Sequence, residues 1–134
     1  MTVSVNQYDE SYQAFGDMRS NQFYFVEFIS ASDKIVQRTS SVAAVLCGVL
    51  QNQPNSGDVA VVRHIGKSKV LVNCVNISCA GYMIGTTALG GADVKLTATA
   101  ASGQYVLGIS VEAAVTSGQL CEVILNGVPH PLAG

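Results

Sequence analysis

The stretch that decides the fold is Val59-Ala-Val-Val-Arg-His-Ile-Gly-Lys-Ser-Lys-Val-Leu-Val-Asn-Cys-Val75. Two runs rich in β-branched residues, 59–65 and 69–75, flank the short link Gly66-Lys67-Ser68. Branched side chains favour extended backbone because they pack well on a pleated surface, and glycine is common in tight turns. The stretch therefore predicts a β-hairpin with its turn at 66–68.

Further strand-like runs separated by polar breaks lie on both sides of this stretch. Towards the N-terminus, strand-like runs at 23–29, 34–38 and 42–50 are separated by polar breaks. The break at 51–57 contains Pro54, Asn55 and Gly57 and is the clearest loop in the chain, because these residues are strong turn formers. Towards the C-terminus, strands are expected at 94–99, 105–111 and 119–125.

The pattern as a whole predicts an all-β fold. After residue 30 no amphipathic pattern is long enough for a helix. Short strands at regular intervals with turn residues between them are typical of a small β-barrel or sandwich. A single β-barrel-like domain is therefore expected over residues 21–134.

The first 20 residues have a different character. They are polar, show no clean period, and carry the spaced aromatic residues Tyr8, Tyr12 and Phe15. This composition indicates an extended N-terminal arm over residues 1–20. Aromatic rings serve cores and interfaces alike, so the arm packs either against the chain's own barrel or against a neighbouring subunit.

Composition narrows the possible functions. Charged residues make up 12% of the 134 residues, about half the usual quarter, while hydrophobic residues make up 49%. This balance excludes disorder and favours a surface that neighbouring subunits cover. The net charge is -2 and the seven Lys and Arg residues are scattered, so no nucleic-acid partner is expected.

Membrane insertion and export are not expected either. The longest apolar run, 42–50, is about half of the ~20 residues that a membrane span requires. The N-terminus lacks the basic and apolar regions of a secretory signal. We therefore expect a protein that is made in the cytoplasm and does not enter a membrane.

Catalytic and metal-binding patterns are not found in the sequence. Apart from the adjacent Asp9 and Glu10, the acidic residues are spread singly. Gly66-Lys67-Ser68 has Val61 where a phosphate-binding loop needs its first glycine. The cysteine spacing does not match zinc sites, so the thiols are interpreted as reduced and mostly buried. These cysteines are Cys47, Cys74, Cys79 and Cys121. The sequence predicts no enzyme, no metal and no cofactor.

Several blocks resemble the bacteriophage head decoration family, also called capsid cement proteins. The most specific block is Cys47-Gly-Val-Leu-Gln-Asn-Gln-Pro-Asn-Ser-Gly57, followed by Val59-Ala-Val-Val-Arg63 and Gly66-Lys-Ser-Lys-Val70. The segments Val106-Leu-Gly-Ile-Ser-Val-Glu-Ala-Ala114 and Ser117-Gly-Gln-Leu-Cys-Glu-Val-Ile-Leu125 resemble the closing part of the family. The resemblance covers roughly residues 20–125.

The resemblance implies a virion structural protein without enzymatic activity. The protein would be made in the host cytoplasm and would decorate the outer surface of a phage capsid. Its partners would be the major capsid protein and further copies of itself, in a homotrimer. It would stabilise the expanded shell. The residues expected to contact the capsid or a neighbouring subunit are Tyr8, Tyr12 and Phe15 of the arm, and Gln51, Asn52, Pro54 and Asn55 of the 51–57 loop.

Two other classes of protein are compatible with parts of this sequence. A head-fibre or host-surface recognition module would share the all-β texture and the lack of a catalytic signature. An enzyme or small-ligand barrel would need convergent polar groups, which the sequence does not suggest.

Overall fold

The structure is a computed structural model that describes residues 7–29, 33–39, 46–72, 81, 83–86, 92–94, 105–113 and 118–131. Every regular element in these ranges is a β-strand, which confirms the predicted all-β fold. The strands are β1 (Tyr8–Ala14), β2 (Phe25–Phe28), β3 (Ile35–Arg38), β4 (Leu46–Leu50), β5 (Val59–Leu71), β6 (Met83–Thr86), β7 (Ala92–Val94), β8 (Tyr105–Ser110) and β9 (Leu120–Pro131).

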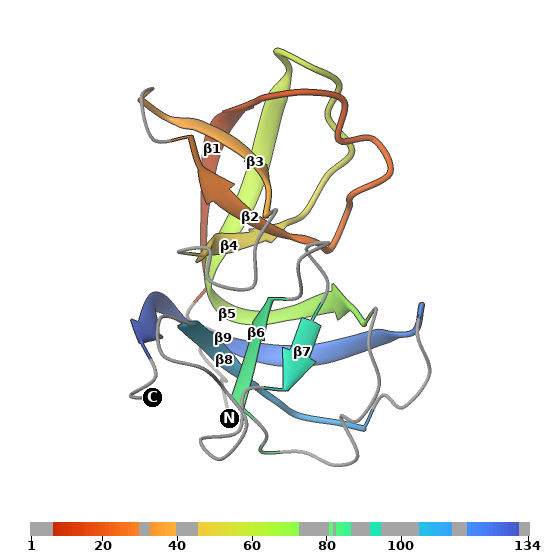
Figure 1. Cartoon of the computed structure of the whole chain (residues 1–134), viewed down its shortest axis with the longest axis vertical. Coiled ribbons are helices and arrows are strands. Elements are labelled where there is room, and N and C mark those ends of the chain that lie inside the picture. The colour runs from red at the N-terminus through yellow and green to blue at the C-terminus, as the bar shows by residue number, and fades with distance from the viewer. Residues whose placement is uncertain are drawn as a thin grey trace, which may run out of the picture.

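The first five strands close into a small barrel. They are hydrogen-bonded in the order β1-β3-β2-β4-β5, and β5 pairs back with β1 to complete the ring. The β1–β3 pair is parallel, and the other pairs of the ring are antiparallel. Closure removes the sheet edges that would otherwise remain open on β1 and β5 here. The barrel forms the upper half of Figure 1.

β5 is shared by the barrel and a second sheet. Its first half, Val59–Ile65, pairs with β1 and β4, and its second half, Ile65–Leu71, pairs with β9. The second sheet continues in the order β5-β9-β8-β6-β7. The strand bends where it leaves the barrel, and Gly66 takes a φ of 107° there. Figure 1 shows the long strand turning from the upper to the lower half of the molecule.

The predicted hairpin at 66–68 is therefore wrong. Gly66-Lys67-Ser68 bends the chain but does not reverse it, and Gly66 and Ser68 pair with Leu125 and Val123 of β9. The alternation of buried and exposed residues also continues through the bend to Val70. A partner strand far away in the sequence thus supplies the pairing that a local hairpin would have supplied.

Two hydrophobic clusters fill the molecule. One lies inside the barrel and comprises Ala14, Met18, Val26, Val36, Cys47, Leu50, Ala60 and Val62. The other contains Phe25 and Val49 together with Val70, Val72, Ile84, Leu107, Cys121, Val123 and Leu125 of the second part of the chain. Successive side chains of a strand point to opposite faces, so β2 and β4 contribute to both clusters. The second cluster therefore joins the barrel to the second sheet.

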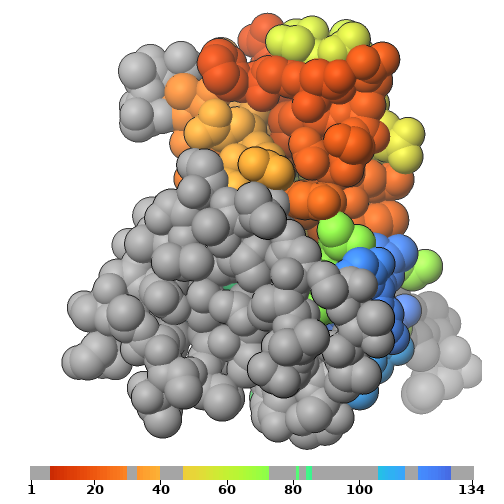
Figure 2. Space-filling model, turned by 45° about the vertical axis from the view of Figure 1, so that its right-hand side comes forward, coloured from red at the N-terminus to blue at the C-terminus, as the bar shows by residue number. Residues whose placement is uncertain are grey.

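The N-terminal segment is part of the barrel. Residues 8–14, expected as part of an extended arm, form β1 and pair with both β3 and β5. The described part of the segment thus packs on the chain's own barrel, which is one of the two alternatives that the sequence left open. In the space-filling view, the N-terminal residues, coloured red to orange, cover much of the upper half of the molecule (Figure 2).

Several predicted strands are confirmed. The runs at 23–29, 34–38 and 105–111 correspond to β2, β3 and β8, and residues 51–58 form a loop without a strand. The prediction of a strand ending at residue 125 is wrong, because β9 continues to Pro131. A register shift and Gly127, with a φ of 88°, allow the strand to continue beside β8 despite its prolines.

Parts of other predictions fall outside the described residues. Only 46–50 of the run at 42–50 and only 94 of the run at 94–99 are described, and both lie in strands. Cys74 and Cys79 also lie outside the described residues.

Candidate interaction site

Four rings gather around Tyr12, which packs against the barrel cluster, and we call them the aromatic cap: Tyr8, Tyr12, Phe28 and His64. Tyr8 stacks on His64 with ring centroids 5.5 Å apart and an interplanar angle of 28°. Tyr12 lies edge-on to both Phe28 and His64, at centroid distances of 5.3 and 5.6 Å. Three strands, β1, β2 and β5, therefore supply one cluster of rings.

A chain of hydrogen bonds holds the centre of the cap. His64 Nδ1 lies 2.8 Å from the carbonyl oxygen of Cys47, which can only accept, so Nδ1 carries the proton. In the neutral ring Nε2 is then an acceptor, and the Tyr12 hydroxyl donates to it at 2.7 Å. Burial raises the pKa of the Tyr12 hydroxyl, so it keeps the proton that it donates. Tyr12 and His64 are thus fixed parts of the barrel.

The outer members of the cap are open to solvent. Tyr8 is 48% exposed and Phe28 is 49% exposed. Aromatic side chains are frequent anchors of protein interfaces because they bury a large area and lose little conformational entropy. The cap therefore presents two partly exposed rings on a rigid base, which suits contact with another protein.

The third predicted aromatic contact lies elsewhere. Phe15, which is 60% exposed, follows β1 and lines a cavity of about 480 Å³ with Met18, Asn21 and Gln37 among its other residues. The structure therefore brings Tyr8 and Tyr12 together but does not bring Phe15 to the cap.

The predicted contact loop is held mainly by internal bonds. Asn52 Nδ2 donates to the Val59 carbonyl at 2.8 Å, and Asn52 Oδ1 accepts from the Val61 amide at 3.0 Å. Pro54 is buried, and its carbonyl accepts from the Met18 amide at 2.9 Å. Asn52 and Pro54 thus shape the loop, which leaves Asn55 as the exposed member of the predicted set.

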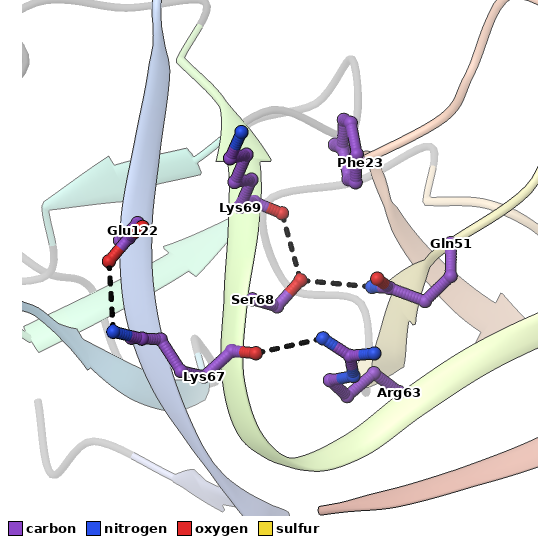
Figure 3. Close-up of a pocket in the computed structure, with 7 residues that line it drawn as sticks. All are labelled: Phe23, Gln51, Arg63, Lys67, Ser68, Lys69 and Glu122. Atoms are coloured by element: carbon purple, nitrogen blue, oxygen red, sulfur yellow. Dashed lines mark hydrogen bonds and ion pairs between the residues drawn. The ribbon is translucent and has the colours of Figure 1, made fainter.

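Gln51 lies in a pocket at the junction between the barrel and the second sheet, which we call the junction pocket. The pocket has a volume of about 280 Å³. Figure 3 shows the residues that line it: Phe23, Gln51, Arg63, Lys67, Ser68, Lys69 and Glu122. Phe23 comes just before β2, Gln51 begins the 51–57 loop, Glu122 lies on β9, and the others lie on β5. Four of these seven residues lie on β5, with Arg63 in its first half and Lys67, Ser68 and Lys69 in its second half.

Two ion pairs border the junction pocket. Arg63 donates from Nε and Nη2 to the two carboxylate oxygens of Asp9 at 2.8 and 3.2 Å. This guanidinium holds the pKa of Asp9 below its usual value. Lys67 Nζ lies 3.4 Å from Glu122 Oε2. Among the described residues, Lys69 has no ion-pair partner.

The second sheet exposes apolar residues on its outer face. Ile109 of β8 and Ile124 of β9 are directly opposite each other in the ladder, and both are largely exposed. Lys67 of β5 lies opposite Ile124 on the other side. This face mixes apolar and charged groups, in contrast to the aromatic cap.

The described cysteines are not expected to react as nucleophiles near neutral pH. Cys47 and Cys121 are free and buried. Burial raises the pKa of the Cys47 thiol to about 12 and that of Cys121 to about 11. Both thiols are therefore protonated near neutral pH and are poor nucleophiles.

The described part of the chain contains no group of three or more His, Cys, Asp or Glu side chains placed to hold a metal ion. It also contains no helix with the length and hydrophobicity needed to cross a membrane.

The sequence did not reveal Phe28 and His64 as partners of Tyr8 and Tyr12. Phe28 alternates with Val26 along β2, and His64 alternates with Val62 along β5, so both point to the barrel side of their strands. This period of two was the available signal. The alternation along each strand does not show which strands are neighbours in the sheet, so the four-ring cluster could not be predicted from the sequence.

The chain was compared with protein families, curated proteins and solved structures, and the matches lie among the solved structures. No protein-family model and no curated protein matches the sequence. Among solved structures, the N base of head fiber gp8.5 of bacteriophage phi29 is similar, with a TM-score of 0.63 and 16% sequence identity. The match covers 92% of this chain and 98% of that chain. At this identity the likeness shows a shared fold.

Proposed function

We propose that this chain is a structural protein of a bacteriophage head. The observation that carries the proposal is the similarity over nearly the full length of both chains to the N base of a phage head fiber. The resemblance of several sequence blocks to head decoration proteins points to the same broad class of protein. Fold similarity alone does not define function, so the proposal also depends on the surface of the molecule.

The finer proposal is a capsid decoration protein on the outer surface of the head. A protein that binds only the assembled, expanded shell stabilises that shell by its binding free energy at each site. Low charge and a net charge of -2 suit a surface that packs against copies of itself and against capsid protein, away from the packaged DNA. Homotrimers would place such contacts around a threefold position of the shell.

The aromatic cap is the proposed contact surface. It combines two half-exposed rings with a hydrogen-bonded base, and interface hot spots are enriched in such aromatic residues.

Phe28→Ser is expected to weaken head binding at least tenfold, because it removes an exposed ring without breaking the Tyr12–His64 bond. Ile124→Ser is the matched control, because Ile124 is 45% exposed on the second sheet. Equal losses in both variants would contradict this assignment.

A second candidate is the base of a head fibre, which the name of the structural neighbour favours. A fibre base and a decoration protein both bind the head, but they differ in what binding does to the shell. We expect a decoration protein, which binds only the intact shell, to raise the temperature at which heads release DNA, and a fibre base, which can bind intact and opened shells equally, to leave that temperature unchanged.

The proposed role requires no catalysis. The junction pocket is small, the two described cysteine thiols are protonated, and the cap histidine is occupied on both ring nitrogens. We therefore propose that the chain acts by binding alone.

Co-sedimentation with phage heads tests the proposed function. Purified protein is mixed with compact precursor shells and with expanded heads of a phage that carries this sequence. Saturable binding to expanded heads, together with a higher temperature of DNA release, supports a decoration protein. Saturable binding without that rise supports a fibre base. No binding to either form of head would overturn the proposal.

A further inference from the structure

We propose that the junction pocket is an oxyanion site that receives a carboxylate, supplied by an Asp or Glu side chain of a protein partner. This inference goes beyond the proposed function and does not depend on it.

The acceptors on the pocket side of β5 are already used. Ser68 Oγ donates to the Lys69 carbonyl at 2.9 Å, and Arg63 Nη1 donates to the Lys67 carbonyl at 2.9 Å. Ser68 Oγ in turn accepts from Gln51 Nε2 at 2.9 Å. These bonds lie side by side in Figure 3. Because the protein itself occupies these acceptors, they are not offered to a ligand.

Donors remain on the same side of the strand. In a β-strand, the N–H and C=O of one residue point to the same side, and successive residues alternate. The Lys69 carbonyl faces the pocket, where Ser68 binds it, so the Lys69 N–H faces the pocket too. Leu71 shows the same direction, because its N–H donates to the Phe23 carbonyl instead of to β9. A pocket that offers donors suits a ligand that only accepts.

The charge around the pocket favours a single negative charge. Three cations, Arg63, Lys67 and Lys69, face two carboxylates, Asp9 and Glu122. Arg63 is paired with Asp9, and Glu122, which pairs with Lys67, also lies opposite Lys69 in the ladder, so the group of five carries one positive charge in excess. A carboxylate carries one negative charge, whereas a phosphate monoester carries about 1.5 to 2. The pocket therefore matches a carboxylate better than a phosphate.

Phe23 shows that the pocket wall is held in an unusual conformation. Its φ is 68°, a left-handed value that is costly for a bulky residue. Two backbone bonds hold it there: its N–H donates to the Leu50 carbonyl at 2.7 Å, and its carbonyl accepts from the Leu71 amide at 3.0 Å. The ring then forms an apolar wall beside Lys69 (Figure 3). Such a wall offers an apolar surface to the methylene groups of an Asp or Glu side chain whose carboxylate lies in the pocket.

Nuclear magnetic resonance of the ¹⁵N-labelled protein tests this site directly. Glutarate is the carboxylate probe, and inorganic phosphate is the second probe at matched ionic strength. We expect saturable shifts of the Ser68 and Lys69 amide signals with glutarate in the millimolar range. Lys69→Gln is expected to weaken glutarate binding at least fivefold, while Lys69→Arg retains it. Lys69 is exposed, so these changes are not expected to disturb folding.

Lys34→Gln is the matched control, because Lys34 is an exposed cation outside the pocket. Its glutarate affinity is expected to equal that of the unchanged protein. Shifts that rise linearly without saturation, or that are the same in Lys69→Gln and Lys34→Gln, would overturn the site. Phosphate binding more than tenfold tighter than glutarate would overturn the assignment to a carboxylate. Because the assay contains no phage heads, its result is separate from that of the proposed function.

Discussion

Gly48 shows how one residue permits the close approach of two neighbouring strands in the barrel, β4 and β5. A Cβ atom at this position would lie 2.3 Å from the Arg63 carbonyl oxygen and 2.7 Å from Val62 Cγ1. We expect Gly48→Ala to lower the free energy of unfolding by about 2–3 kcal/mol, as overpacking against backbone does. Urea unfolding measures this loss.

Gly118→Ala is the comparison for Gly48. Gly118 has a φ of 90° but open space around its Cβ position, so only the backbone strain of about 1–2 kcal/mol applies. An equal or larger loss at Gly118 than at Gly48 would contradict the close approach of β4 and β5.

The hydroxyl of Tyr12 carries a second prediction at this scale. Tyr12→Phe removes the donor to His64 Nε2 and leaves that nitrogen without its bond. The expected loss in unfolding free energy is about 0.5–1.5 kcal/mol, the usual contribution of a hydrogen bond. Tyr8→Phe should change stability little, because the Tyr8 hydroxyl contacts the exposed Glu10. Similar losses in both variants would contradict the role of the bond in the cap.

Asp9 predicts a specific loss of stability in acid. Its pKa is lowered in the folded state, chiefly by hydrogen bonds from Arg63. Its stabilisation is therefore present above its unfolded pKa of about 3.9 and is lost as the pH falls through the lower folded value. At about pH 6, Asp9→Asn should cost about 0.5–1 kcal/mol, as partly exposed ion pairs do. Urea unfolding at about pH 2.5 should show a smaller difference; a constant difference would contradict the prediction.

At the scale of the element, β5 is the strand on which the architecture depends. The Leu71 amide donates to Phe23 and not to β9. Because successive residues of a strand point their backbone groups to opposite sides, Lys69 also points away from β9, and the Ser68 and Val70 amides donate to β9. Hydrogen exchange should therefore be slow at Ser68 and Val70 and at least tenfold faster at Lys69. Rapid exchange at Ser68, as in a hairpin turn, would contradict the continuous strand.

The strands themselves could be predicted from local pattern, but their pairing could not. Alternating apolar residues identified β2, β3 and β8, since burial on one face of a sheet leaves a period of two. The bend at Gly66 was interpreted as a turn because glycine serves both purposes. Barrel closure joins β1 to β5 across about fifty residues, and no local pattern specifies such a contact.

The candidate site shows the same limit. Tyr8, Tyr12 and Gln51 were chosen from the sequence and lie in the aromatic cap or the junction pocket. Phe28 and Lys69 were not chosen, because their importance comes from neighbours that the fold supplies. Asn52 and Pro54 were expected at an interface, and the structure gives them a role within the loop.

At the scale of the whole molecule, two lobes share one strand and one hydrophobic cluster. The barrel carries the aromatic cap, and the junction with the second sheet carries the cationic pocket. Because β5 passes through both lobes, the two surfaces are held in a constant relation to each other. A rigid unit of this kind loses little entropy on docking, which favours binding to a repeated, preformed shell.

The most direct test of the central claim is cryo-electron microscopy of expanded phage heads that carry this chain. We expect two-lobed density of the size of this 14.0 kDa chain on the outer surface, with the aromatic cap at a protein contact. Heads without this density outside the shell, or with the chain located inside it, would contradict the claim.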